Sequence, residues 1–304
     1  MDAKIYQSKK YIAFFLIPAF LFMAVYLYYP FVQNILISFQ KIKLLASTSQ
    51  GWLDPIYKNY LKLFEEIWKD GHFNTTSNLF LSLKNTGITI VATMVGQVGL
   101  ALLLSILVSN IKKGAGFFRV VFFFPIVVSA TALGLLFNLL FLFDGGMINQ
   151  LLMGLGIIEQ NFDWKAQVPI FTMLTPVIWQ YVGFYFVILL TGISGISEEL
   201  YEAASIDGAT KFQSVKYITL PLLKNSISTC VILAVTGALK VFDLPWTMFP
   251  KGMSNTWLTG TYMYERSQAN VSYSAAISIV IVVLGVILSA IVNRLFKTDS
   301  DLDM

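Results

Sequence analysis

Long runs of apolar residues, separated by short polar stretches, dominate the hydropathy pattern of this 304-residue chain. A bilayer core of roughly 30 Å needs about 20 mainly apolar residues per helix. The runs that reach this length cover about 11–37, 84–109, 119–142, 168–192, 224–247 and 273–296. Each run is apolar on all sides, which is typical of a helix surrounded by lipid. The pattern predicts an all-α membrane protein in which residues 1–304 form one domain with six transmembrane helices.

Composition supports a membrane protein, since 56% of the residues are hydrophobic and only 12% are charged. The first apolar run follows Lys9 and Lys10 but is too long for the core of a signal peptide, so we expect a retained span. Cys230 is the only cysteine and His72 the only histidine, which excludes a disulfide within the chain and a Cys/His metal cluster. The sequence has no cluster of Lys and Arg of the kind that indicates a nucleic-acid-binding surface.

The distribution of Lys and Arg around the spans predicts the orientation. Basic residues are denser on the side that holds the N-terminus, because those on the other side are spread over a long loop at about 38–83. We therefore expect both termini, and the segment at about 193–223, to lie in the cytoplasm of a bacterium, with the chain in its inner membrane. Within the long outer loop, residues at helical spacing predict a short amphipathic helix: Ile56, Tyr60, Leu63, Phe64 and Ile67.

A polar stretch between the fourth and fifth spans carries the most informative pattern. Ser197 followed by two glutamates predicts the start of a short helix through about residue 204. Gly208 permits a tight turn, a second helix at about 210–217 follows, and Pro221 fits the first turn of the fifth span. By physical chemistry alone, an amphipathic connector without a partner is an equally good interpretation.

The residue order in this stretch resembles the EAA loop of ABC importer permeases. The residues that carry the resemblance are Glu202, Ala203, Ala204, Asp207, Gly208, Ala209, Ile218, Leu220 and Pro221. In that family an ATPase subunit binds the membrane subunit at this loop. The resemblance therefore implies that the segment at 193–223 couples the chain to ATP hydrolysis, and that Glu202 contacts a basic residue of the ATPase.

Further motifs extend the resemblance over nearly the whole chain, to the permease subunits of carbohydrate ABC importers, such as the larger maltose permease subunit. They are Asn85-Thr86, Phe124-Pro125, the turn from Gly145 to Asn149, Trp179 with Gly183, and Phe242-Asp243. The chain departs from the pattern at Phe249-Pro250-Lys251-Gly252, where many relatives carry Gly-Gly-Gly-Pro. The resemblance implies a type I importer fold and the import of a sugar or oligosaccharide.

The same resemblance implies the partners. They are a second permease subunit, two ATP-binding subunits and an extracytoplasmic solute-binding protein, around a chain embedded in lipid. The sequence contains no Gly-x-x-x-x-Gly-Lys-Ser/Thr motif, so ATP and magnesium belong to the ATPase subunits and this chain is expected to hold no cofactor, no metal and no catalytic residue. Two alternatives stay open: an ABC permease for another solute, such as a polyol or glycerol phosphate, and a secondary transporter.

Polar residues inside spans are candidates for the substrate path, because burying them in hydrocarbon is costly. By resemblance to the maltose permease, the cavity is lined by Ile126, Ala130, Val177, Gln180, Tyr181, Phe184, Ala238 and Lys240. Lys240 and Asp243 are three residues apart, so on one helix they form either a polar patch on the path or a self-satisfied ion pair, unless Lys240 contacts another subunit. The substrate-path candidates are Gln180, Tyr181, Phe184, Lys240, Asp243 and Ser129, whereas Gln97 and Asn138 are expected to bond neighbouring helices.

Overall fold

The computed structural model describes residues 9–43, 48–111 and 114–296, so the terminal residues whose cytoplasmic location was predicted lie largely outside the described part. Contacts divide the chain into two compact units. The first comprises Met1–Trp68 with Met263–Val280, and the second comprises Lys69–Tyr262 with Ile281–Met304. Two helices, α16 (Thr259–Ser267) and α17 (Val271–Phe296), contribute residues to both units.

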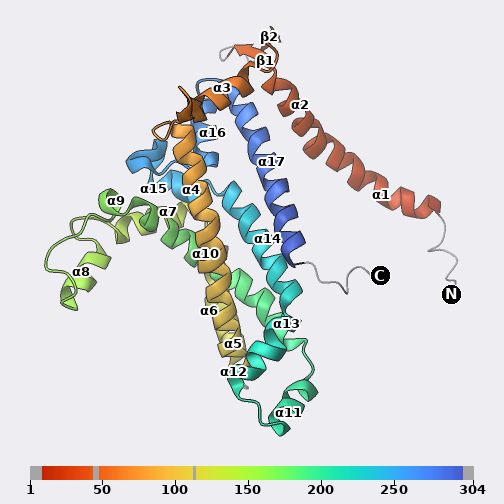
Figure 1. Ribbon diagram of the computed structural model, residues 1–304, viewed down its shortest axis with the longest axis vertical. Coiled ribbons are helices and arrows are strands. Elements are labelled where there is room, and N and C mark those ends of the chain that lie inside the picture. Colours follow the sequence, from red (N-terminus) through yellow and green to blue (C-terminus); the bar gives the residue numbers. More distant parts are fainter. Residues whose placement is uncertain (1–8, 44–47, 112–113, 297–304) are drawn as a thin grey trace. The chain divides into compact units, whose positions relative to one another are not determined.

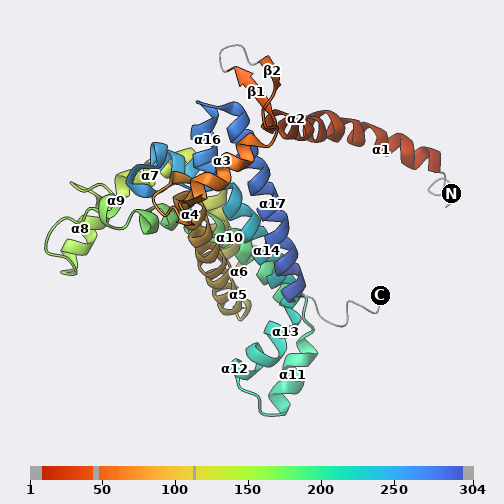
Figure 2. The same cartoon turned by 45° about the horizontal axis from the view of Figure 1, so that its top comes forward.

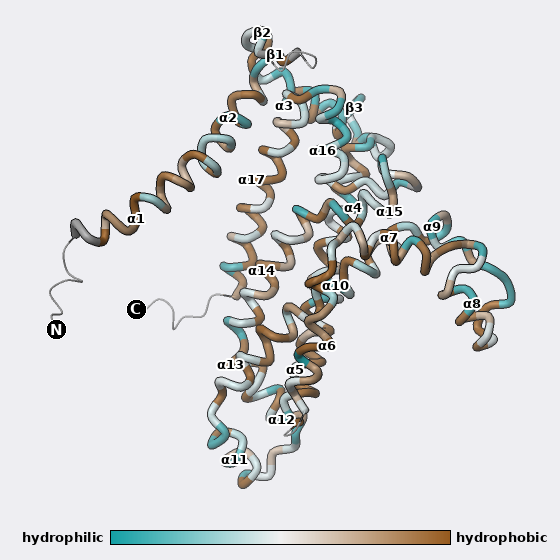
Figure 3. The backbone as a smooth tube through the Cα atoms, turned by 180° about the vertical axis from the view of Figure 1, so that it is seen from behind, coloured by the Kyte–Doolittle hydropathy of each residue, from teal (hydrophilic) through white to brown (hydrophobic). Residues whose placement is uncertain are grey.

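The first unit begins with an apolar helical stretch of 27 residues, Ile12–Ser38. In the most apolar part of this stretch, no residue is buried against the rest of the chain. Its helices are α1 (Lys9–Met23) and α2 (Tyr29–Ser38), joined by a π-helical turn at Ala24–Tyr28. Apolar colouring dominates this stretch (Figure 3). The bare apolar surface agrees with the span predicted at about 11–37, because lipid is its natural neighbour.

A small two-stranded sheet and a short helix follow this stretch in the first unit. Strand β1 (Gln40–Lys43) pairs antiparallel with β2 (Thr48–Trp52), and α3 (Lys58–Ile67) follows where an amphipathic helix was predicted. Helix α3 buries Leu63 and leaves Phe64 exposed. The Asn59 amide donates to the carbonyl of Ser38 at 2.9 Å, so α3 is fastened to the end of α2.

The second unit is a helical bundle (Figure 1). Two short strands precede it, β3 (Trp68–Lys69) and β4 (His72–Phe73). Its longer helices are α4 (Asn78–Ala92), α5 (Leu100–Ser109), α6 (Ala115–Val127), α7 (Ala130–Leu140), α10 (Pro169–Ser194) and α14 (Lys224–Lys240). The shorter ones are α8 (Met147–Gly154), α9 (Trp164–Gln167), α11 (Glu198–Ile206), α12 (Lys211–Ser214), α13 (Leu220–Leu222) and α15 (Asp243–Met248).

Helix α10 is the centre of this bundle and packs against α5, α6 and α14. Its contact with α6 is unusually close at Gly183, where an added Cβ would lie 1.7 Å from the carbonyl oxygen of Phe122. The Phe122 ring meets Phe186 edge to face, with centroids 5.2 Å apart. Small residues allow membrane helices to approach in this way, so Gly183 fixes the position of α10 against α6.

The third predicted span differs from the structure. The sequence predicted one span over 119–142, but α6 and α7 are separate helices bent by 95°. Pro125 lies in the last turn of α6, and Val128 and Ser129 are extended, with ψ of 136° and 132°. The described residues therefore contain five helices long and apolar enough to cross a membrane, and a sixth if the bent pair counts as one span.

The fifth predicted span, at about 224–247, agrees with the apolar helical stretch Lys224–Met248, which carries a short local break. Helix α14 ends at Lys240, Val241 is extended, and α15 begins at Asp243. Each charge lies at the helix end whose dipole favours it, an ammonium at the carboxyl end and a carboxylate at the amino end. The prediction that both residues lie on one helical face is therefore wrong, and no ion pair joins these two described residues.

Two asparagines bind the loops that follow α7 and α15. Asn149 is fully buried; it donates to the carbonyls of Leu142, Phe143 and Phe162, and its Oδ1 accepts from Trp164 Nε1 at 2.8 Å. Asn85 donates to the carbonyls of Asn255 and Trp257 at 2.7 and 2.9 Å, and Trp257 lies over Gly252. The loop that contains the departure at 249–252 thus has a defined structure: a 3-10 turn, Pro250–Asn255.

Candidate functional site

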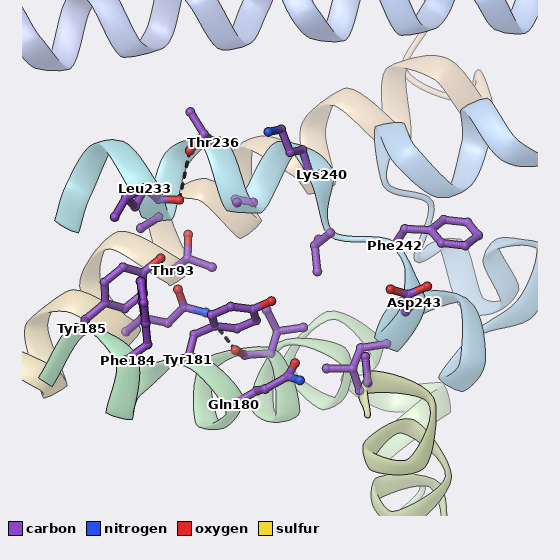
Figure 4. A pocket seen from close by; sticks show the side chains of 18 residues that line it. Thr93, Gln180, Tyr181, Phe184, Tyr185, Leu233, Thr236, Lys240, Phe242 and Asp243 are labelled. Carbon is purple, nitrogen blue, oxygen red and sulfur yellow. Dashed lines mark hydrogen bonds between the residues drawn. The ribbon is translucent and has the colours of Figure 1, made fainter. Parts of the chain in front are cut away.

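A cavity of about 380 Å³ lies inside the second unit, within the roughly 300–1,000 Å³ typical of small-molecule sites. Residues from α7, α10, α14, α15 and the π-helical segment Thr93–Gly99 line it (Figure 4). The lining residues are Thr93, Gln97, Ala130, Val177, Gln180, Tyr181, Phe184, Tyr185, Leu233, Ala234, Thr236, Gly237, Ala238, Lys240, Val241, Phe242, Asp243 and Leu244. The cavity therefore adjoins both helix breaks.

Helix α10 supplies an aromatic and amide face to the cavity. Gln180, Tyr181, Phe184 and Tyr185 are spaced so that they share one side of the helix, and Figure 4 shows the three rings together along it. Gln180 is only 5% exposed, and its amide lies 3.4 Å from the carbonyl of Val128. That carbonyl follows the end of α6, so Gln180 satisfies a backbone group that the helix break leaves without a helical donor.

The π-helical segment places Thr93 and Gln97 against the same cavity. Gln97 is 3% exposed and donates from Nε2 to the carbonyl of Val177 at 2.8 Å, one turn before Gln180. Next to it, a Cβ on Gly96 would approach the Ile178 side chain to 2.8 Å. These contacts fix α10 relative to the segment at the level of the cavity.

Most of the predicted substrate-path residues come together here. Gln180, Tyr181, Phe184, Lys240 and Asp243 all line the cavity, whereas Ser129 lies at the α6–α7 break outside the lining. Of the positions implied by the resemblance, Ala130, Val177 and Ala238 line it and Ile126 does not. Polar lining residues that the sequence reasoning did not propose for the path are Thr93, Gln97, Tyr185 and Thr236.

The predicted helix–helix bonds are confirmed for Gln97 and Asn138. Asn138 of α7 donates to the carbonyl of Thr247 in α15 at 3.3 Å, and it accepts from Lys165 of α9. Burial lowers the pKa of Lys165, and the carboxylate of Asp163 partly opposes the shift. Asn138 thus links α7 and α15, the two helices that follow the breaks.

The polar stretch after α10 forms a second feature at the end of the second unit away from α15 (Figure 2). Ser197 caps α11 by accepting from the Glu199 amide, as predicted, and Gly208 has a φ of +78° in the turn to α12. A capping box between Thr210 and Gln213 begins α12. The Tyr201 hydroxyl lies 2.9 Å from that of Thr219, which holds the two arms of the turn together.

This turn exposes an apolar surface that nothing in the described chain covers. Ile206 is 87% exposed, and Leu200, Phe212 and Tyr217 are also exposed. Glu202 lies exposed on the same helix as Leu200 and Ile206. An apolar surface with a nearby carboxylate is typical of a protein-binding site, and it matches the position predicted for a coupling loop.

A family model described as "Binding-protein-dependent transport system inner membrane component" matches residues 97–298, which include the cavity lining from Gln97 onward and the whole exposed turn. The chain belongs to this family. The fold class and the family resemblance deduced from the motifs are thereby confirmed.

Relatives of this transport family match along almost the whole chain. A probable ABC transporter permease, YurN of Bacillus subtilis (strain 168), is 30% identical and the match covers 97% of this chain and 99% of YurN. The arabinooligosaccharide transport permease AraP of Halalkalibacterium halodurans is 28% identical over 96% of this chain and 89% of AraP. The lactose transport permease LacF of Rhizobium radiobacter is 29% identical over 90% of each chain.

A solved structure shows the same permease fold. A chain of a bacterial ABC transporter that imports the acidic polysaccharide alginate has a TM-score of 0.79 and 19% identity, with 96% of this chain and 97% of that chain covered. The likeness supports a helical, membrane-embedded ABC importer fold. The chain is a membrane component of a transport system, in agreement with its apolar helices.

Proposed function

We propose that this chain is the permease subunit of an ATP-driven sugar or oligosaccharide importer and that its cavity is part of the substrate path. The observation that carries the proposal is the convergence of Gln180, Tyr181, Lys240 and Asp243 on one cavity beside two helix breaks, one between α6 and α7 and one between α14 and α15. Interrupted helices at membrane depth border cavities because their free backbone groups need polar surroundings. Several relatives are named for the transport of sugars or oligosaccharides, including arabinooligosaccharides and lactose.

The exposed turn from α11 to α13 is the docking site for an ATPase subunit. Its apolar side chains would enter a groove of the partner, and Glu202 would form a charge-assisted bond with an Arg or Lys. The chain has no phosphate-binding loop, so ATP and magnesium bind to two partner ATPase subunits. In this proposed arrangement the turn and both chain termini would face the cytoplasm of a bacterium.

A second permease subunit and an extracytoplasmic solute-binding protein complete the complex. The family description names a binding protein, and a solved relative of this fold was crystallised with an alginate-bound periplasmic protein. A secondary transporter needs no such protein, so this alternative loses its support. Glycerol phosphate and other anionic solutes remain the second candidate because Lys240 lies in the cavity lining.

The docking role is tested by replacing Glu202 with lysine, which turns an attraction into a repulsion. We expect Glu202→Lys to reduce co-purification with the ATPase subunits and uptake by about tenfold or more, while the amount of protein in the membrane is unchanged. Glu159→Lys, an exposed change outside the turn, is the matched control and leaves both intact. Normal uptake by Glu202→Lys would contradict the docking assignment.

A further inference from the structure

We propose that the cavity takes an uncharged, hydroxyl-rich glycan, and that it discriminates against sugar acids and phosphorylated polyols. The inference rests on the proposed function and names the cargo class of the same site. The polar atoms of the lining that keep free hydrogen-bonding capacity favour this cargo.

The two threonines of the lining present acceptors only. Thr93 Oγ1 donates to the carbonyl of Ile90 at 3.0 Å, and Thr236 Oγ1 donates to the carbonyl of Ile232 at 2.8 Å. A hydroxyl has one hydrogen and two lone pairs. Because each hydrogen is held by the residue's own helix, only lone pairs remain for a cargo molecule, and Figure 4 shows Thr93 and Thr236 on different lining elements.

The two glutamines each offer an acceptor, and each Nε2 also keeps one hydrogen that it can donate to a sugar oxygen. The carbonyl of Val177 fixes the amide orientation of Gln97, because only Nε2 can donate to it. Gln180 is oriented in the same way by the carbonyl of Val128. No donor among the described residues bonds to the Oε1 of Gln97 or of Gln180. Neither oxygen belongs to the fully buried polar atoms without a partner, so both are accessible. Both oxygens are therefore available to accept.

The charges of the lining cancel. Asp243 adds a carboxylate, which accepts only, and Lys240 adds the single ammonium of the lining. The two side chains are not paired with each other, since a helix break separates them. The oxygens of an anionic group cannot donate to the four neutral acceptor oxygens of the lining, which would stay unpaired. They would also meet the carboxylate of Asp243, and a like-charge contact is costly.

A neutral glycan fits this arrangement because every sugar hydroxyl can donate to those acceptors. Tyr181 and Tyr185 add phenolic hydroxyls, and the rings of Tyr181, Phe184 and Phe242 offer apolar faces to the C–H faces of sugar rings. A site built to accept hydrogen bonds rejects molecules that lack the donors, since its own acceptors then stay unpaired. The cavity therefore selects for hydroxyl donors and against carboxylate or phosphate oxygens.

A matched pair of probes isolates charge from shape. Trigalacturonate and its fully methyl-esterified form have the same backbone and differ in charge; lactose, arabinotriose and glycerol 3-phosphate extend the series. Each is offered to the importer complex that co-purifies with this chain, in lipid nanodiscs without the binding protein. Ligand-observed NMR by saturation transfer then reports contact and relative affinity. We expect the ester to bind about tenfold or more tightly than the trianion.

The variant Asp243→Asn removes the carboxylate from the lining and leaves Lys240 unopposed. We expect it to narrow the preference for the ester over the trianion by about threefold or more. Asp70→Asn is the control: it makes the same change of charge at an exposed position outside the cavity, where the backbone φ of 53° suits asparagine. The control keeps the wild-type preference.

Each outcome has a separate meaning. If the trianion or glycerol 3-phosphate binds the wild-type complex as tightly as the neutral probes, the inference about charge is wrong and the proposed importer function stands. If Asp70→Asn narrows the preference as much as Asp243→Asn, the cavity does not sense the charge and the inference is also wrong. If no probe of either kind gives a signal at millimolar concentration, the cavity is not a glycan site, which overturns its role in the proposed function as well.

Discussion

The close approach of α10 to α6 at Gly183 makes a sharp structural prediction for Gly183→Ala. The new Cβ would lie 1.7 Å from the carbonyl oxygen of Phe122 and 2.3 Å from its carbonyl carbon. Carbon and oxygen atoms in ordinary contact are about 3.4 Å or more apart. The obstacle is backbone, which cannot rotate away, so the two helices must separate by about 1.7 Å.

The magnitude follows from what this separation disrupts. Overpacking of a helix contact costs about 1–3 kcal/mol, and the edge-to-face pair of Phe122 and Phe186 contributes about 0.5–1.5 kcal/mol that weakens as the rings move apart. Alanine is intrinsically a better helix former than glycine by about 1 kcal/mol, which offsets part of the loss. The net destabilisation is therefore about 1–3 kcal/mol, or a lower melting midpoint by about 3–10 °C.

The single cysteine provides the assay. Cys230 is fully buried in α14, so a fluorogenic maleimide reacts with it only when the helices separate. The labelling rate of purified protein in detergent, measured on heating, gives the midpoint for each variant. Because α10 also carries Gln180 and Tyr181, the same variant should transport more slowly than the wild type.

A matched glycine on α6 separates overpacking from the general effect of alanine. Gly116 lies in α6, and an added Cβ there meets nothing within 4 Å. Gly116→Ala is expected to leave the midpoint unchanged or raise it slightly. If Gly183→Ala melts at the same temperature as Gly116→Ala, the close helix contact does not exist as described and the reasoning fails.

Three further predictions concern the turns and loops. Gly208→Val places a branched residue at a φ of +78°, which strains the α11–α12 turn by about 1–2 kcal/mol. It should lower uptake relative to Gly116→Val, where an added Cβ meets nothing within 4 Å, with membrane insertion measured by immunoblot. Asn149→Ala removes the side-chain hydrogen bonds of a fully buried residue and should open the 142–164 loop to limited proteolysis. Burial lowers the pKa of Lys165 below its usual 10.5. Between the lowered pKa and 10.5 the unfolded chain binds more protons than the folded one, so the free energy of unfolding rises with pH in this window. Lys165→Met should abolish the rise in melts monitored by tryptophan fluorescence.

Hydropathy was sufficient to locate the long helices of the bundle. The runs at 168–192 and 273–296 correspond to α10 and α17, since uninterrupted apolar sequence in lipid has no alternative to a helix. The local signals of the exposed turn were equally direct. Ser197 and Gly208 act on the backbone within a few residues of themselves. The helix start and the turn that they cause could therefore be predicted without knowledge of the tertiary structure.

Hydropathy averaged over a span did not reveal the breaks in the third and fifth spans, because the few polar residues there, Ser129, Lys240 and Asp243, lie within long apolar runs. Pro125 does not show where the first break lies, because it is inside the last turn of α6 and not at the bend. Val241 and Phe242 gave no signal at the second. Thr93 was missed for a related reason: its position depends on a π-helical segment that hydropathy does not reveal.

The position of the cavity follows from these breaks and not from the polar residues alone. A helix that ends within a membrane leaves carbonyl groups without donors, and lipid cannot satisfy them. The protein meets this need at Val128 with the amide of Gln180, which is therefore both a structural partner of the break and a wall of the cavity. Polar side chains gather where the backbone is interrupted, and Lys240 and Asp243 do so at the second break. A search for substrate-path residues in related chains should therefore begin at interrupted spans and proceed outward to the neighbouring helix faces.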